Sequence, residues 1–231
     1  MRILIVNPNT SERCSAGILA AAREQAGLGV SVEVTTTFDG PPYVETPRDE
    51  VVAAAAVLRV LEEAALEKVG GYDAFIIACS SDPGLEAARA AFDVPVLGIG
   101  ESALLLARGL GLPYAILANV AGDEPYMWAL ARRYGLDQGL VSVQAAGHTV
   151  EDFDLGRQGV QEGLMCAAQR AVRAGARSLC LGCAAMAGLE QEVARVTGVP
   201  VFEGVASAVR LAVAYLALMD AVPDRRRTSS S

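Results

Sequence analysis

The strongest constraint on this chain is a pattern that occurs twice, once around Cys79 and once around Cys183. In both copies a glycine precedes an apolar run that ends at the cysteine, Gly71 in the first copy and Gly175 in the second. Gly-Leu-Glu then follows each cysteine at the same spacing. A unit repeated in this way within 231 residues indicates duplication. We therefore expect two similar lobes.

Apolar runs of strand length alternate with helix-compatible segments along the whole chain. The runs are continuous rather than alternating in polarity, which is typical of parallel strands buried on both faces. We expect strands at residues 3–6, 30–36, 74–78, 94–97, 114–118, 140–144, 178–181 and 199–202, and helices at 11–26, 48–69, 84–92, 101–109, 123–134, 154–174, 187–197 and 204–220. The predicted fold class is α/β, with two pseudo-symmetric lobes, each a parallel sheet flanked by helices.

The lobes need not be continuous in sequence. We expect residues 1–98 plus 204–222 to form the first α/β lobe, residues 99–203 to form the second, and residues 223–231 to form a disordered tail. The pair Asp82-Pro83 is a typical start signal for the third helix, because aspartate is a favoured N-cap and proline a favoured first residue.

Composition excludes several classes of function. The net charge of −8 offers no basic surface for nucleic acid. No apolar stretch reaches the ~20 residues of a membrane span, and no signal-peptide core follows Met1. The five cysteines lack zinc-site spacing and His148 is the only histidine, so we expect no metal. We expect a cytoplasmic homo-oligomer that acts on a small molecule and has no nucleic-acid or membrane partner.

Cys79 and Cys183 occupy the same place in each copy, after an apolar strand and before a turn into a helix. Ligands of parallel α/β sheets bind beyond the carboxyl ends of the strands. The partial positive charge of a helix N-terminus stabilises a thiolate, so we expect both cysteine pKa values to lie below the usual ~8.5. The residues that follow, Ser80-Ser81 and Ala184, are small and leave room for a ligand.

Two facing lobes would present these thiols to opposite sides of one cleft. One thiolate can then remove a proton from one face of a carbon acid, and the other thiol can return a proton to the opposite face. Donors near the strand ends would stabilise the negative charge of the intermediate. This arrangement predicts a racemase. The other cysteines have no matched partner, and we expect them to be packing residues: Cys14, Cys166 and Cys180.

Several motifs together resemble the aspartate/glutamate/hydantoin racemase superfamily, and within it the hydantoin and allantoin racemase group. The resemblance extends to about residue 220, and the motifs that carry it are Ile5-Val6-Asn7-Pro8-Asn9-Thr10-Ser11, Cys79-x-x-Asp82-Pro83-Gly84-Leu85, Pro95-Val96-Leu97-Gly98-Ile99-Gly100, Leu181-Gly182-Cys183-Ala184-x-Met186 and Gly198-Val199-Pro200-Val201. It implies a pseudo-symmetric two-lobe protein that uses no cofactor and racemises a hydantoin or allantoin.

The resemblance also implies roles for individual residues. Cys79 and Cys183 match the catalytic acid and base. Asn9 matches the Asn-Pro-Asn-Thr turn at the substrate cleft. We expect the substrate-binding residues to be Asn9, Ser80, Ser81, Asn119 and Ala184. Ala184 favours the hydantoin branch over the amino-acid racemases, which typically have threonine there.

The chain departs from the group at two places. Ser80-Ser81 replaces the usual Phe-Gly, and Ala118-Asn119 replaces the usual Thr-Thr. Both places are expected to line the pocket, so they bear on the choice of substrate. The polar serine pair favours a small polar ring, such as allantoin or a short-chain hydantoin, over a bulky aromatic substituent.

Other functions remain open at this point. On the same scaffold they are a maleate-type isomerase, an arylmalonate-type decarboxylase and an aspartate or glutamate racemase. The decarboxylase relatives keep a single cysteine, so the presence of Cys79 argues against that activity. A thiol redox protein would pair Cys79 or Cys180 with Cys183 in a reversible disulfide. A non-catalytic sensor would bind a small ligand between the lobes without proton exchange.

Overall fold

The computed structural model describes residues 1–66 and 71–221, and in this part of the chain the strands form two four-stranded parallel sheets. The first sheet has the order β2-β1-β3-β4 and the second has the order β6-β5-β7-β8. The strands are β1 (Arg2–Asn7), β2 (Ser31–Thr36), β3 (Ala74–Ile77), β4 (Val96–Gly98), β5 (Tyr114–Ala118), β6 (Leu140–Ala145), β7 (Ser178–Leu181) and β8 (Val201–Phe202). The two orders are identical after a shift of four strands, so the predicted α/β class and the two similar lobes are confirmed.

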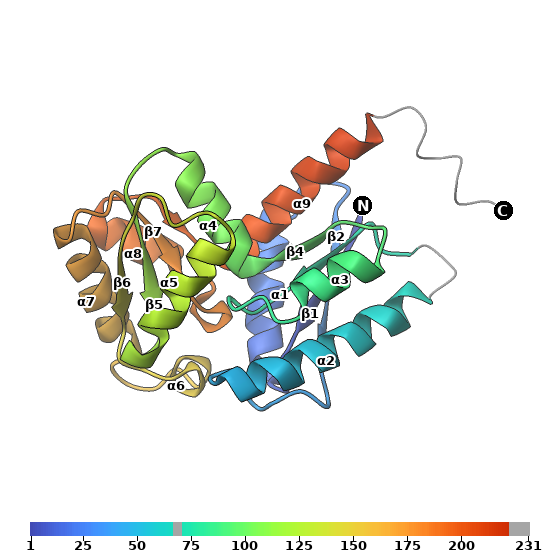
Figure 1. The fold of residues 1–231 in the computed structure, drawn as a ribbon, viewed down its shortest axis with the longest axis horizontal. Helices are drawn as coiled ribbons and strands as arrows, with labels where there is room; N and C mark the ends of the chain where they lie inside the picture. The colour runs from blue at the N-terminus through green and yellow to red at the C-terminus, as the bar shows by residue number, and fades with distance from the viewer. Residues whose placement is uncertain (67–70, 222–231) are drawn as a thin grey trace.

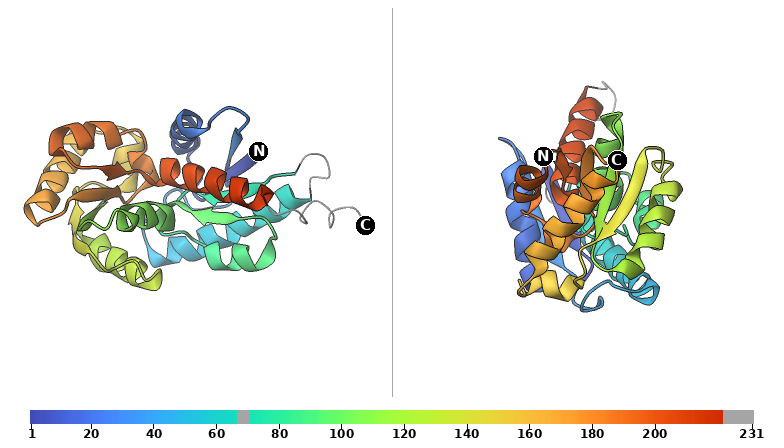
Figure 2. Two further views of the ribbon diagram at one scale, coloured as in Figure 1. Left: turned by 90° about the horizontal axis from the view of Figure 1, so that it is seen from above. Right: turned by 90° about the vertical axis from the view of Figure 1, so that its left-hand side faces the viewer.

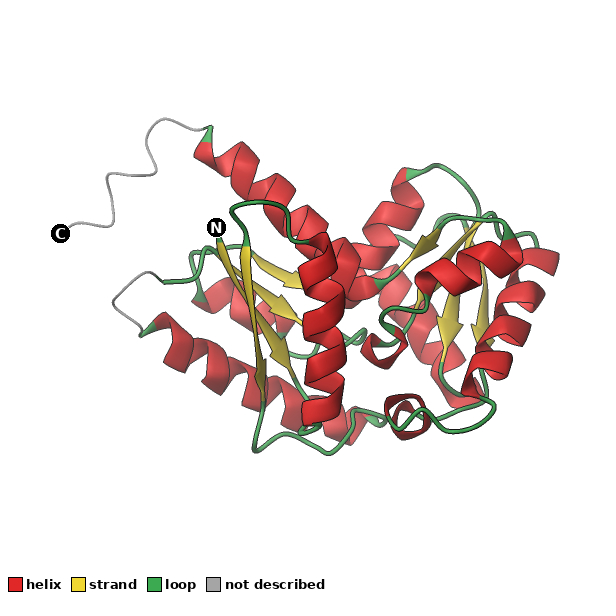
Figure 3. Cartoon of the chain, turned by 180° about the vertical axis from the view of Figure 1, so that it is seen from behind, coloured by secondary structure: helices red, strands yellow, loops and turns green. Residues whose placement is uncertain are grey.

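Helices cover both faces of each sheet, as Figure 3 shows. They are α1 (Glu12–Gln25), α2 (Pro47–Ala65), α3 (Leu85–Ala91), α4 (Ile99–Gly109), α5 (Glu124–Arg133), α6 (Val150–Asp154), α7 (Val160–Arg173), α8 (Glu190–Thr197) and α9 (Gly204–Asp220), with single 3-10 turns at η1 (Ala121–Asp123) and η2 (Ala184–Met186).

Three predicted elements differ from the structure for identifiable reasons. The helix expected at residues 154–174 is interrupted, because Gly156 and Gly159 adopt φ values of 63° and 90° between α6 and α7. The strands expected to begin at Val94 and Val199 instead begin one residue after a proline, at Val96 and Val201. Proline has no N–H for the ladder, so pairing starts after it.

Helices α4 and α9 lie at the junction of the lobes (Figure 1). Ala103 and Leu104 of α4 pack into a core with β5 and β7 of the second sheet. Val205 and Val209 of α9 pack into a core with β1 and β3 of the first sheet, and α9 extends from the junction along that lobe (Figure 2). The predicted tail at residues 223–231 and residue 222 lie outside the described residues.

None of the helices in the described residues is both long enough and apolar enough to cross a membrane. The cores consist of aliphatic side chains from the strands and the small faces of alanine-rich helices. The carboxyl ends of β1, β3, β5 and β7 all meet where the lobes join, which places the residues that follow these strands around one space.

Candidate active site

A cavity of about 350 Å³ lies between the lobes, and both lobes contribute its walls. The structure brings every residue predicted for the site to this one cavity: Asn9, Cys79, Ser80, Ser81, Asn119, Cys183 and Ala184. The repeat explains this convergence, because equivalent strand ends of two similar lobes face a shared space.

The two cysteines are held by equivalent backbone contacts. The residue before Cys79, Ala78, donates its N–H to the carbonyl of Val6 at 2.9 Å, which extends the pairing of β3 with β1. The residue before Cys183, Gly182, donates its N–H to the carbonyl of Leu117 at 2.8 Å, which extends the pairing of β7 with β5. Each cysteine is therefore fixed one step beyond a paired strand, with its thiol at the cavity.

The prediction that both cysteine pKa values are lowered is wrong for this protein. Burial raises the pKa of the Cys79 thiol to about 11, against hydrogen bonds from Ser81 that lower it. Burial also raises the pKa of the Cys183 thiol. The expected helix field is weak: α3 begins at Leu85, several residues after Cys79, and Cys183 precedes only the single turn η2.

The residue after Cys79 joins the two cysteine-bearing turns. The buried hydroxyl of Ser80 donates a hydrogen bond to the carbonyl of Gly182 at 2.6 Å, and Gly182 directly precedes Cys183. The next residue, Ser81, places its hydroxyl 3.3 Å from the Cys79 sulfur. Ser80 thus links the lobes, and Ser81 contacts the thiol itself.

Two asparagines lie just beyond the carboxyl ends of β1 and β5. The Oδ1 atom of Asn9 accepts hydrogen bonds from the Nδ2 of Asn7 at 2.9 Å and from the N–H of Ser11 at 2.8 Å. Asn119 lies near enough to Cys183 to lower the pKa of that thiol, yet its buried Nδ2 meets no acceptor at hydrogen-bonding distance among the described residues. A buried donor without a partner is rare, and this one lines the cavity.

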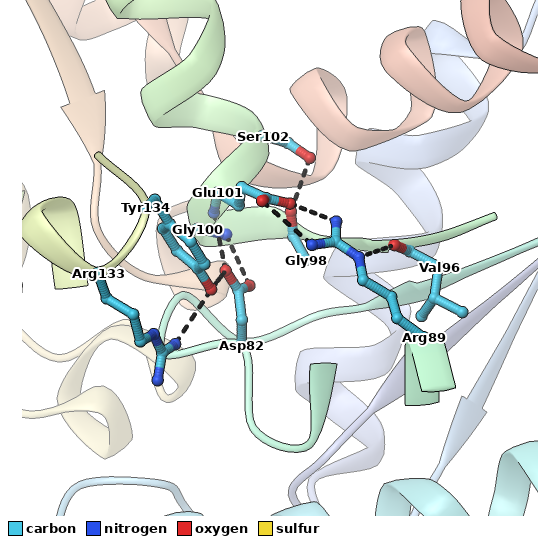
Figure 4. A network of polar contacts seen from close by, with 9 residues as sticks. All are labelled: Asp82, Arg89, Val96, Gly98, Gly100, Glu101, Ser102, Arg133 and Tyr134. Atoms are coloured by element: carbon cyan, nitrogen blue, oxygen red, sulfur yellow. Dashed lines mark hydrogen bonds and ion pairs between the residues drawn. The ribbon is translucent and has the colours of Figure 1, made fainter. Parts of the chain in front are cut away.

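Asp82 supports the first cysteine turn from behind (Figure 4). Its carboxylate accepts the N–H groups of Gly100 and Glu101 at 2.9 and 2.8 Å and the hydroxyl of Tyr134 at 2.7 Å. Asp82 therefore caps α4, not α3 as its sequence position predicts; α3 has Gly84 as its N-cap. Burial raises the pKa of Asp82 to about 7 although all three hydrogen bonds lower it.

Several cavity residues were not predicted from sequence. Cys14 belongs to the first lobe's core, as expected of a packing residue, and also lines the cavity. Glu50 and Tyr126 line it as well, and Tyr126 also packs against a core cluster of the second lobe. All three lie in the first turn of a helix that follows a strand. Helix starts lie at the carboxyl edge of a parallel sheet, and this rule could have identified them.

The remaining cysteines lie away from the cavity. Cys180 is inside β7, where its thiol contacts the carbonyl of Ala103 at 3.6 Å, and it packs in a different core cluster from Cys183. Cys166 is exposed on α7. No group of three or more His, Cys, Asp or Glu side chains suited to a metal ion occurs within residues 1–66 and 71–221.

Comparison with known proteins shows what the chain is similar to. Residues 3–212 match the Asp/Glu/hydantoin racemase family. A hydantoin racemase of Paenarthrobacter aurescens is 32% identical over 219 residues, covering 94% of this chain and 92% of that protein. The structure of allantoin racemase from Klebsiella pneumoniae matches with a TM-score of 0.90 and 31% identity, over 95% of this chain and 89% of that one. Allantoin racemase from Pseudomonas fluorescens matches with a TM-score of 0.87 and 31% identity, over 95% and 92%.

Proposed function

The chain belongs to the Asp/Glu/hydantoin racemase family and is a racemase, and on that premise we propose that it inverts the stereocentre of a 5-substituted hydantoin or of allantoin through two cysteine thiols. The observation that carries the mechanism is the equivalence of Cys79 and Cys183. Both follow matched strands of two similar sheets, and both line one cavity. We propose that the protein works without a cofactor, in the cytoplasm, as a homo-oligomer, and that it acts on small molecules rather than nucleic acid or membranes.

In the proposed reaction one cysteine is a thiolate and the other a thiol. The thiolate takes the proton from the C5 carbon, the electron pair moves onto the adjacent carbonyl oxygen, and the opposing thiol protonates C5 from the other face. The protein ends with thiol and thiolate exchanged, and the next turnover runs in the opposite sense.

The raised pKa values suit a reaction at carbon. A thiolate whose conjugate acid has a pKa of about 11, as at Cys79, is a stronger base than an ordinary cysteine thiolate. The pKa of such a thiol is closer to that of a weakly acidic C–H group, so transfer of the proton from carbon to sulfur is less unfavourable. The cost is a smaller thiolate fraction at neutral pH.

The negative charge that forms on the carbonyl oxygen needs hydrogen-bond donors. The buried Nδ2 atom of Asn119 is one candidate, because it lines the cavity and has no acceptor among the described residues. The N–H of Ala185, which lowers the pKa of Cys183, is a second. Donors fixed in place before the reaction can stabilise such an oxyanion without reorganisation.

The charge of the cavity favours a neutral ring over the anionic alternatives. None of the described side chains that line it is Lys, Arg or His, whereas Glu45, Glu50 and Asp123 do line it. Aspartate, glutamate, maleate and arylmalonate all carry carboxylates, which ordinarily require cationic partners or several N–H donors. A hydantoin ring carries no carboxylate, so the acidic side chains of the cavity do not repel it.

Proton NMR in deuterated water tests the proposal. We expect the wild-type protein to remove the C5–H signal of allantoin and of short-chain hydantoins, and to leave the Cα–H signals of aspartate and glutamate unchanged. The protein with both cysteines replaced by serine is the control, because it retains the cavity but lacks both thiols. Exchange of aspartate or glutamate alone, or faster exchange of 5-benzylhydantoin than of allantoin, would contradict the proposed substrate class.

A further inference from the structure

Glu50 stands apart from the other acidic residues at the start of α2. Its neighbour Asp49 caps the helix, since its carboxylate accepts the N–H and the hydroxyl of Thr46 at 2.9 and 2.7 Å. The helix end is therefore satisfied without Glu50. Glu50 is instead half-buried and lines the cavity. An acidic side chain that is not needed for capping and is partly withdrawn from water needs another explanation.

The contacts of Glu50 place it beside the reacting thiols. Burial raises the pKa of the Glu50 carboxyl, and the nearby side chains of Tyr126 and Ser81 oppose that rise. Ser81 in turn contacts the Cys79 sulfur at 3.3 Å, and the charge of Glu50 is near enough to raise the pKa of Cys79. A carboxylate offers about four acceptor positions. The Glu50 carboxylate therefore has acceptor capacity on the cavity side.

The other acids of the cavity wall are bound by backbone groups. Glu45 accepts the N–H of Val150 at 2.8 Å, and Asp123 accepts the N–H of Val120 at 3.1 Å. The side chains that act on the Glu50 carboxyl, those of Tyr126 and Ser81, themselves line the cavity. Glu50 is thus the acidic group of the wall that is best placed to accept a donor from a ligand.

The nearest cation does not change this assignment. Burial raises the pKa of Glu50, and the charge of Arg133 opposes that rise from a distance, but Arg133 does not line the cavity. One of its guanidinium nitrogens donates to the carbonyl of Ser81 at 3.4 Å and to the hydroxyl of Tyr134 at 3.1 Å. Arg133 therefore supports the Glu50 carboxylate from behind the wall and offers no direct partner for an anionic ligand in the cavity.

We propose that Glu50 determines specificity by accepting hydrogen bonds from N–H groups of the substrate's 5-substituent, and so selects neutral N–H-bearing substituents, such as a ureido group, over carboxylates. The inference rests on the proposed function, because it assumes that a hydantoin ring is held between Cys79 and Cys183. A carboxylate on the substituent would face the Glu50 carboxylate across the cavity and be repelled. An alkyl substituent would leave Glu50 desolvated without a new partner.

Three hydantoins with 5-substituents of nearly equal size provide the test: 5-ureidohydantoin (allantoin), 5-isobutylhydantoin and 5-carboxymethylhydantoin. For each substrate, kcat/KM of a variant is divided by that of the wild type, which cancels the intrinsic acidity of the substrate. We expect Glu50→Leu to lower the ratio for allantoin roughly 10- to 100-fold relative to the isobutyl compound, the range of a charge-assisted hydrogen bond. The same variant should raise the ratio for the carboxymethyl compound.

Two further variants separate the effect of the Glu50 charge from its role as a hydrogen-bond acceptor and from a general effect on the fold. Glu50→Gln keeps an acceptor oxygen but removes the charge, so it should lose less activity on allantoin and still gain on the carboxymethyl compound. Glu62→Gln, an equal charge change on the exposed face of α2, should alter no ratio. Equal changes for all three substrates in both Glu50 variants would overturn the inference while leaving the proposed function intact. A wild-type protein that exchanges none of the three hydantoins would overturn the proposed function, and the inference with it.

Discussion

The hydroxyl of Ser80 donates a hydrogen bond to the carbonyl of Gly182 at 2.6 Å, and this single contact joins the residue after one cysteine to the residue before the other. It crosses from the first lobe to the second and is buried. Because Cys79 and Cys183 are each one covalent step away, the bond restrains the relative position of the two thiols.

Replacing Ser80 with alanine should therefore affect activity more than stability. We expect Ser80→Ala to lower the free energy of unfolding by about 1 kcal/mol, the net value of one hydrogen bond, and to lower kcat further than that loss implies. Ser102→Ala is a matched control, because the Ser102 hydroxyl donates to the Gly98 carbonyl at the same 2.6 Å but only four residues away, at the start of α4. Chemical denaturation measures the free energy of unfolding of each variant, and initial rates give its kcat. Equal kcat in the two variants would show that the Ser80 bond is only structural.

A substitution at Gly100 tests how the start of α4 supports the turn that contains Ser80. A Cβ atom at Gly100 would overlap the carbonyl oxygen of Ser80 and also approach the Asp82 carboxylate. We expect Gly100→Ala to cost about 1–3 kcal/mol of stability and to reduce activity strongly, because the backbone that carries Cys79 must move. Gly109→Ala, at the other end of α4 with no atom within 4 Å of the added Cβ, should retain stability and activity. Thermal unfolding measures the stability of the two variants, and the rate of hydrogen exchange between substrate and solvent measures their activity.

The alkylation rate of Cys79 should show its raised pKa directly. Burial disfavours the charged thiolate, so a pKa of about 11 leaves about one thiolate in 10,000 at pH 7, and this fraction rises about tenfold with each pH unit. We expect labelling of Cys79 by iodoacetamide to be slow at pH 7 and about 100-fold faster at pH 9. Peptide mass spectrometry follows it, with the exposed Cys166 as the internal reference for reagent access. Rapid labelling of Cys79 at pH 7 would contradict the effect of burial.

The sequence predicts the strands and the paired cysteines well because both depend on local patterns. Continuous apolar runs indicate buried parallel strands, and the repeat around Cys79 and Cys183 implies their common cavity. The role of Asp82 could not be predicted, because its carboxylate binds N–H groups that are distant in sequence, on Gly100 and Glu101. A local N-cap signal does not reveal whether the aspartate caps the next helix in the sequence, α3, or a later helix that packs against it, α4.

The cysteine pKa values were mispredicted for a related reason. The expected lowering relied on a helix start close to each thiol, which is a local property. The rise comes from burial, and burial depends on how the two lobes close around the cavity. Glu50 likewise lines a cavity that this closure forms, together with Tyr126 of the second lobe.

The last prediction separates the roles of the two thiols. In a two-base racemase each enantiomer presents its acidic hydrogen to only one cysteine. Replacing Cys79 with serine removes the base for one enantiomer and the acid for the other, and Cys183→Ser does the reverse. A serine hydroxyl is too weakly acidic to replace either group at neutral pH. We therefore expect net racemisation to fall by several powers of ten in each single variant, as measured by polarimetry.

Exchange with solvent should survive selectively, and this outcome identifies the mechanism. The remaining thiolate can still remove and return a proton on its own face, so each variant should incorporate deuterium into one enantiomer only, with retention of configuration. The two variants should act on opposite enantiomers. Cys166→Ser, which changes an exposed thiol on α7, should exchange both enantiomers at the wild-type rate. Full racemisation by either variant, or exchange of the same enantiomer by both, would show that Cys79 and Cys183 are not the paired acid and base.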